Sequence, residues 1–189
     1  MNMDIIFYCE PLASNDGYTW TIVSRLGDIF NNIEQLFGPR DKTYTILGIE
    51  IANIEQPQIW FPANNGNVII QITPDCLNDM GKAIFQIAHE AIHCLNPKIA
   101  GTATLLEEGL ATWFSQHYTA KCGYNIVPNI DKYIKAMIYV EKLLSYDAQI
   151  ILKIRKSTMM DLSKINADML LGICPQIDID LANILTRKF

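Results

Sequence analysis

The chain has 189 residues, half of them hydrophobic, and a formal net charge of −5 at neutral pH. This length suits a single domain with a substantial buried core. The acidic balance argues against partners such as nucleic acid or anionic membranes, and no stretch approaches the roughly 18 apolar residues of a membrane span.

The first part of the chain is predicted to contain strands and one helix. A short apolar run at 3–9 indicates a buried strand, and apolar residues from 18 to 37 recur with helical spacing until Gly38-Pro39 ends the pattern. Three segments rich in Ile, Val, Tyr and Trp then predict strands, at 43–51, 58–62 and 67–72. The last two of these strands are placed to form a hairpin.

Helices predominate from residue 78 onward. A helix is expected over 78–95, where Asn96-Pro97 ends it, and a second helix over about 105–120. After Gly123 no strand pattern is evident. Further helical patterns follow one another at about 129–145, 147–155, 159–171 and 178–187.

This order of elements predicts an α+β fold. A strand-and-helix half, residues 1–122, would carry a small mixed sheet, and an all-helical half, residues 123–189, would pack on it. No linker rich in Gly, Ser or Pro separates the two halves, so we expect one compact unit and not two independent domains.

Cysteine usage and the N-terminus bear on the cellular compartment. Five cysteines stand at wide spacings without a Cys-x-x-Cys pair, which is typical of free thiols and not of a zinc ribbon or a disulfide framework. The first residues lack a basic segment, and their apolar run is too short for a signal peptide. We therefore expect a cytoplasmic protein.

The most informative pattern is His89-Glu-Ala-Ile-His93, which lies in the helix expected over 78–95. Histidines four residues apart lie on one face of a helix, so both imidazoles can bind one metal ion. Glu90 between them points to a different part of the same face, where it can hydrogen-bond a water molecule on that metal. The alternative is a hydrogen-bonded pair of core histidines, but burying them beside a carboxylate without a metal would be costly.

Glu107 and Glu108 compete for the role of third ligand, which would leave one coordination position open. Thr104-Leu-Leu-Glu107 fits a capping box, in which the Thr104 hydroxyl caps the helix and Glu107 returns to the Thr104 amide. A Glu107 side chain engaged in this cap would not be available to bind the metal. We therefore favour Glu108 as the ligand, and Gly109 beside it would let the two helices approach closely.

The pairing of His89-Glu90-x-x-His93 with Glu108-Gly-Leu-Ala resembles the gluzincin group of zinc metallopeptidases. The matched motifs lie within residues 87–114, and the resemblance implies a zincin-like two-helix active site in the first half of the chain. It maps His89, His93 and Glu108 onto the ligands of one Zn²⁺ ion and Glu90 onto the general base. The short connection between the two motifs is more similar to the compact members of the group.

The residues around the expected metal ligands differ in part from those of the larger gluzincins. Thermolysin-like members place an aspartate four residues after the ligand glutamate to orient a histidine, whereas Thr112 stands there in this chain. A threonine can hydrogen-bond an imidazole, though without a charge. For the group that stabilises the oxyanion we name His117 as the candidate catalytic residue. Nearby tyrosines are the alternatives: Tyr118, Tyr124, Tyr133 and Tyr139.

The resemblance implies a hydrolase that takes a peptide or protein substrate, added as a strand along the sheet edge at 58–62 or 67–72. Two other functions stay open. A deformylase-like hydrolase of a small amide would use an upstream cysteine as third ligand, but Thr-Pro-Asp-Cys76 does not match that setting. A binding or regulatory module could retain the fold and the zinc without catalysis. Neither the natural substrate nor the oligomeric state follows from the sequence.

Overall fold

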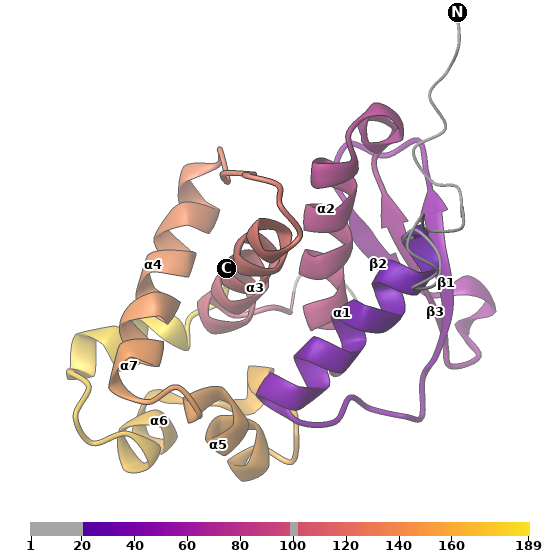
Figure 1. Ribbon diagram of the computed structural model, residues 1–189. Helices are drawn as coiled ribbons and strands as arrows, with labels where there is room; N and C mark the ends of the chain where they lie inside the picture. The colour runs from indigo at the N-terminus through magenta and orange to yellow at the C-terminus, as the bar shows by residue number, and fades with distance from the viewer. Residues whose placement is uncertain (1–20, 99–101) are drawn as a thin grey trace, which may run out of the picture.

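The computed structural model describes residues 21–98 and 102–189. The strand predicted at 3–9 and the start of the helix predicted from residue 18 lie outside the described residues. Within them the fold is α+β, with a three-stranded sheet and seven α-helices (Figure 1). This class is the one that the sequence predicts.

The sheet consists of β1 (Thr45–Ile51), β2 (Gln58–Trp60) and β3 (Asn67–Ile72) in the order β1-β3-β2. β3 pairs parallel with β1 and antiparallel with β2, so the predicted hairpin is confirmed. Because β3 is central, its backbone groups are paired on both sides, and β2 is the edge strand of the hairpin. Alternate residues of β3 enter the core: Val68, Ile70 and Ile72.

Two helices pack against the sheet: α1 (Ile22–Phe37) and α2 (Met80–His93) (Figure 1). α1 begins at a capping box formed by Thr21 and Ser24, and it ends at Gly38, whose φ of 86° suits glycine. Its buried residues form the apolar stripe that the sequence predicts: Leu26, Ile29, Ile33 and Phe37.

The remaining helices extend the core away from the sheet. α3 (Leu105–Lys121) lies between α2 and α4 (Asp131–Tyr146), as Figure 1 shows. Three shorter helices follow, α5 (Ile150–Ser157), α6 (Ala167–Ile173) and α7 (Ile179–Leu185). Short 3₁₀ turns occupy Pro62–Asn64, Pro74–Asn78 and Leu162–Lys164. One hydrophobic cluster runs through residues from α1 to α7.

The helix predicted over 159–171 is wrong in its first half. Met159 and Met160 have φ values of 53° and 69°, so the chain turns through the left-handed region there. A 3₁₀ turn follows, and α6 begins only at Ala167, where the Asn166 side chain caps the helix by accepting from the Met169 amide. Before Ala167, Leu162 and Ile165 are buried by this turn, whereas Met159 is exposed, so the apolar spacing there does not mark a helix.

Two predictions on composition can be compared with the described residues. The described cysteines are free thiols, at Cys76, Cys94, Cys122 and Cys174, while Cys9 lies outside the described part. Among the helices of residues 21–98 and 102–189, none combines the length and the apolar character needed to cross a membrane.

Candidate metal centre

α2 brings the histidine motif into the interior. Its N-cap is Asp79, whose side chain accepts from the Lys82 amide, and the helix is buried along most of its length because apolar residues surround it. His89 and Glu90 are 8% and 5% exposed. The rings of His89 and His93 lie one turn apart with centroids separated by 5.3 Å.

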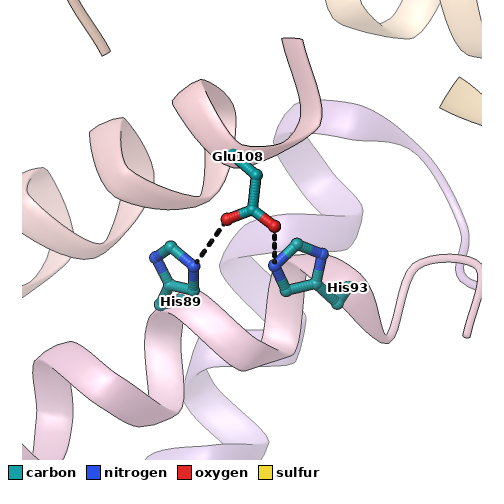
Figure 2. Close-up of side chains that lie close together, drawn as sticks. All are labelled: His89, His93 and Glu108. Atoms are coloured by element: carbon teal, nitrogen blue, oxygen red, sulfur yellow. Dashed lines mark hydrogen bonds and ion pairs between the residues drawn. The ribbon is translucent and has the colours of Figure 1, made fainter. Parts of the chain in front are cut away.

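α3 supplies the third donor. The Nε2 atom of His89 lies 3.2 Å from one carboxylate oxygen of Glu108, and the Nε2 atom of His93 lies 3.6 Å from the other (Figure 2). One donor atom from each of the three side chains lies within 4.8 Å of the others, and this group could hold a metal ion. The structure thus brings together the three residues that the sequence favours as ligands.

Glu107 takes a different position from the one predicted. The Thr104 hydroxyl accepts from the Glu107 amide at 3.3 Å, as expected of the N-cap. The Glu107 carboxylate does not return to the Thr104 amide; its Oε1 lies 2.9 Å from Nδ1 of His93. The capping box is therefore only half formed, because a buried imidazole N–H offers the carboxylate a stronger partner than the helix end does.

Neighbouring charges set the protonation of the ligand groups. Burial raises the pKa of Glu108, but hydrogen bonds from His89 and His93 outweigh burial and hold that pKa well below its usual range. Burial lowers the pKa of His93, but Glu107 and Glu108 outweigh it, so the pKa is raised well above its usual value. Without a cation, a proton on the His93 imidazole therefore offsets part of the negative charge of the neighbouring carboxylates.

Glu90 has a different environment from Glu108. Burial raises the pKa of Glu90, and the imidazoles of His93 and His89 and a backbone hydrogen bond from Ile59 oppose that rise only in part. Three buried or nearly buried carboxylates, those of Glu90, Glu107 and Glu108, thus surround two imidazoles. Carboxylates thus outnumber imidazoles at this site, and the nitrogen and oxygen donors fit a divalent metal ion.

A cleft lies on both sides of His89 and Glu90. One cavity of about 360 Å³ and a second of about 420 Å³ are both lined by these two residues, by Gln56-Pro57 and by Tyr133. The Tyr133 ring meets the His89 ring edge-on at 5.7 Å. Burial, followed by the charges of Glu108 and Glu90, raises the pKa of Tyr133 to about 12. Tyr133 is therefore a neutral hydrogen-bond donor beside the donor cluster.

The edge strand β2 runs beside this cleft. Gln58 and Ile59 line the second cavity together with His93 and Glu108, and the backbone of Ile59 hydrogen-bonds the Glu90 carboxylate. Of the two segments that the sequence offered as a sheet edge, only 58–60 has an unpaired side in the described sheet. The edge strand β2 and the metal-ligand candidates His93 and Glu108 thus line the same cavity.

His117 and Thr112 do not reach the donor cluster. The His117 ring packs at a tilt against the Trp113 ring with centroids 4.3 Å apart, and its Nδ1 is 2.8 Å from the Trp113 carbonyl oxygen. His117 is exposed and is not among the described residues that line the two cavities. The Thr112 hydroxyl donates to the Glu108 carbonyl oxygen at 2.8 Å and not to an imidazole. The hydroxyl thus bonds to the carbonyl one turn earlier in its own helix, as is common for threonine.

One residue at the site has no motif that would have revealed it. Phe189 lines the second cavity, and its ring packs on Tyr133 with centroids 4.7 Å apart. Its backbone amide donates to the Ala103 carbonyl oxygen, and Lys188 forms an isolated antiparallel bridge with Thr104. Because this contact joins residues far apart in the sequence, no local pattern predicts it.

No family model, curated protein or solved structure matches this chain. The resemblance to gluzincins therefore rests on the two sequence motifs alone. The placement of His89, Glu90, His93 and Glu108 is what any functional proposal must explain.

Proposed function

We propose that this protein is a compact gluzincin-like zinc metallopeptidase that hydrolyses peptide bonds with Glu90 as the general base. The observation that carries the proposal is the convergence of His89, His93 and Glu108 beside Glu90, at a cleft that continues on both sides. A pair of core histidines without a metal would not need three carboxylates around it.

His89 and His93 through Nε2, and one oxygen of Glu108, would hold the metal. Two imidazoles and a carboxylate suit Zn²⁺, whereas Ca²⁺ and Mg²⁺ prefer oxygen ligands throughout. When bound, zinc would polarise the substrate carbonyl and lower the pKa of a water molecule towards about 7. The protein's own groups then have to move the proton and steady the charge.

Glu90 performs the proton transfer in this proposal. Its carboxylate accepts a proton from the attacking water as the oxygen–carbon bond forms, and it delivers that proton to the amine nitrogen as the carbon–nitrogen bond breaks. The raised pKa of buried Glu90 suits a group that both accepts and donates.

Tyr133 is the group on this chain best placed to stabilise the oxyanion. Its ring contacts His89 and lines both cavities, and its raised pKa keeps the phenol protonated. A neutral phenol can donate a hydrogen bond to a developing negative charge in a site shielded from water. We therefore assign to Tyr133 the role that the sequence suggested for His117.

The substrate in this proposal is an extended peptide segment. A peptide added to the unpaired side of β2 would gain main-chain hydrogen bonds and would pass Glu90. Its side chains on either side of the cleaved bond would enter the two cavities. This arrangement favours a peptidase over a hydrolase of small amides, which needs no edge strand.

The first test compares the unsubstituted chain with Glu90→Gln and with Glu141→Gln, a change to an exposed glutamate on α4. Zinc per chain is measured by elemental analysis, and hydrolysis is measured with a library of quenched fluorescent peptides. We expect about one zinc in all three proteins. Hydrolysis should fall by about 10²- to 10⁴-fold in Glu90→Gln only, because the general base is lost.

Several outcomes would contradict the proposal. Normal cleavage by Glu90→Gln would exclude Glu90 as the base. An unsubstituted chain that binds zinc but cleaves no peptide would point to the binding module. Cleavage confined to formylated-methionine peptides would point to a small-amide hydrolase.

A further inference from the structure

We propose that Glu107 is a positioning residue for His93: it accepts a hydrogen bond from Nδ1–H and so directs the Nε2 lone pair to the metal. The inference rests on the metal centre of the proposed function and not on the peptidase activity. It gives Glu107, the residue before the ligand Glu108, a role in supporting the metal site, whereas the sequence predicted that Glu107 caps the helix.

The two nitrogens of His93 face two different carboxylates. Nδ1 lies 2.9 Å from Oε1 of Glu107, whereas Nε2, on the other side of the ring, lies 3.6 Å from Glu108. A neutral imidazole carries one proton, so a hydrogen bond from Nδ1–H leaves Nε2 free to bind a cation. The contact with Glu107 thus selects the tautomer that the donor cluster requires.

The geometry of α3 lets two consecutive residues serve the same imidazole. Side chains of neighbouring residues on a helix point about 100° apart. Glu108 therefore reaches between the two imidazoles, as Figure 2 shows, while Glu107 reaches the far side of His93. The Thr104 hydroxyl holds the Glu107 amide and fixes where this first turn begins.

The burial of Glu107 needs an explanation that a helix cap does not provide. The residue is 7% exposed, and among the described residues its Oε2 is buried with no hydrogen-bond partner. A buried carboxylate with a free oxygen is costly unless positive charge lies nearby. A cation bound to Nε2 of His93 would polarise the Nδ1–H group and offset that cost.

Thr112 cannot supply the same support. It occupies the position where thermolysin-like proteins carry an aspartate for a histidine, but its hydroxyl donates to the Glu108 carbonyl oxygen. The carboxylate that supports an imidazole here comes instead from the residue before the ligand. Thr112 therefore offers a matched control: it is buried and lies on the same helix, and its hydroxyl hydrogen-bonds the Glu108 backbone and not an imidazole.

The test measures zinc affinity and the state of the His93 ring in Glu107→Gln, Glu107→Ala and Thr112→Val. Affinity is obtained by competition with a chromophoric chelator. We expect about 10-fold weaker binding in Glu107→Gln, whose amide oxygen can still accept, and about 100-fold weaker binding in Glu107→Ala. Thr112→Val should stay within about 2-fold of the unsubstituted chain, since no imidazole partner is removed.

Nitrogen-15 NMR of the zinc-loaded proteins reports which ring nitrogen of His93 carries the proton. A substitution that only weakened the fold would not change that assignment. We expect a protonated Nδ1 of His93, protected from exchange, in the unsubstituted chain and in Thr112→Val. That proton should lose its protection in Glu107→Ala. X-ray absorption should show two imidazoles and a carboxylate oxygen as ligands in the unsubstituted chain and in Glu107→Gln alike.

The outcomes separate this inference from the proposed function. Equal zinc affinity in all variants would overturn it, and so would loss of a direct oxygen ligand in Glu107→Gln. If Glu107→Ala does not fold, the near-isosteric Glu107→Gln still decides. An unsubstituted chain without zinc would overturn both proposals, whereas the predicted losses in a chain that cleaves no peptide would support this one alone.

Discussion

At the scale of single residues, three glutamates at the site differ in their contacts, although their side chains are chemically identical. Glu90 is buried and its pKa is raised, Glu108 accepts from two imidazoles and its pKa is lowered, and Glu107 lies behind His93. Carboxylates whose pKa values are pushed apart can divide the roles of base and ligand. The motif spacing identifies the candidates, but only their contacts distinguish these roles.

Tyr133→Phe tests the oxyanion role at this scale. We expect kcat to fall by about 10²-fold, because one hydrogen bond that forms in the transition state is lost. Zinc content should not change, since Tyr133 contacts the ligand cluster only through its ring. Tyr139→Phe is the matched control, because Tyr139 is a partly buried residue of the same helix that packs against the core. An unchanged kcat in Tyr133→Phe would exclude the phenol.

At the scale of elements, the site depends on how closely α3 approaches its neighbours. Gly109 follows the ligand Glu108, and a Cβ atom built there would lie 2.4 Å from the Ala136 carbonyl oxygen in α4. The sequence suggested that this glycine allows close approach to the histidine helix. The structure shows that the close contact is with α4, on the other side of α3.

Gly109→Ala should destabilise the protein by about 1–3 kcal/mol, because α3 and α4 must move apart to admit the methyl group. Gly27→Ala is the control: Gly27 lies in α1, and nothing lies within 4 Å of its built Cβ. That change should stabilise the protein by about 0.5–1 kcal/mol through helix propensity alone. Urea unfolding measures both values, and shifts of the same sign would contradict this account.

At the scale of the whole molecule, a buried arginine joins the helical half to the sheet half. Arg155 in α5 is 0% exposed, and its guanidinium donates to the carbonyl oxygens of Phe37, Gly38 and Pro39 at 2.6, 2.9 and 2.8 Å. These oxygens lie where α1 ends, and the last carbonyls of a helix have no partner within it. One side chain thus satisfies the end of α1 from the opposite half of the chain.

Arg155→Lys should lower the free energy of unfolding by about 2–4 kcal/mol, because an ammonium group cannot span three carbonyl oxygens as the planar guanidinium does. Arg187→Lys is the control, since Arg187 is exposed and surface changes stay within about 0.5 kcal/mol. Denaturant titration followed by circular dichroism measures both. Equal midpoints for the two variants would show that the Arg155 contacts contribute nothing.

The sequence by itself determined the elements that local spacing controls. A four-residue interval places His89 and His93 on one helical face wherever the helix lies, and alternating and helical patterns located the strands and most helices. Only the tertiary structure decided which distant residues meet there. It brings Tyr133 and Phe189 to the cleft, turns Glu107 to His93 and leaves His117 outside. Periodicity fixes which face of a helix is buried, whereas the packing of one helix on another fixes which atoms touch.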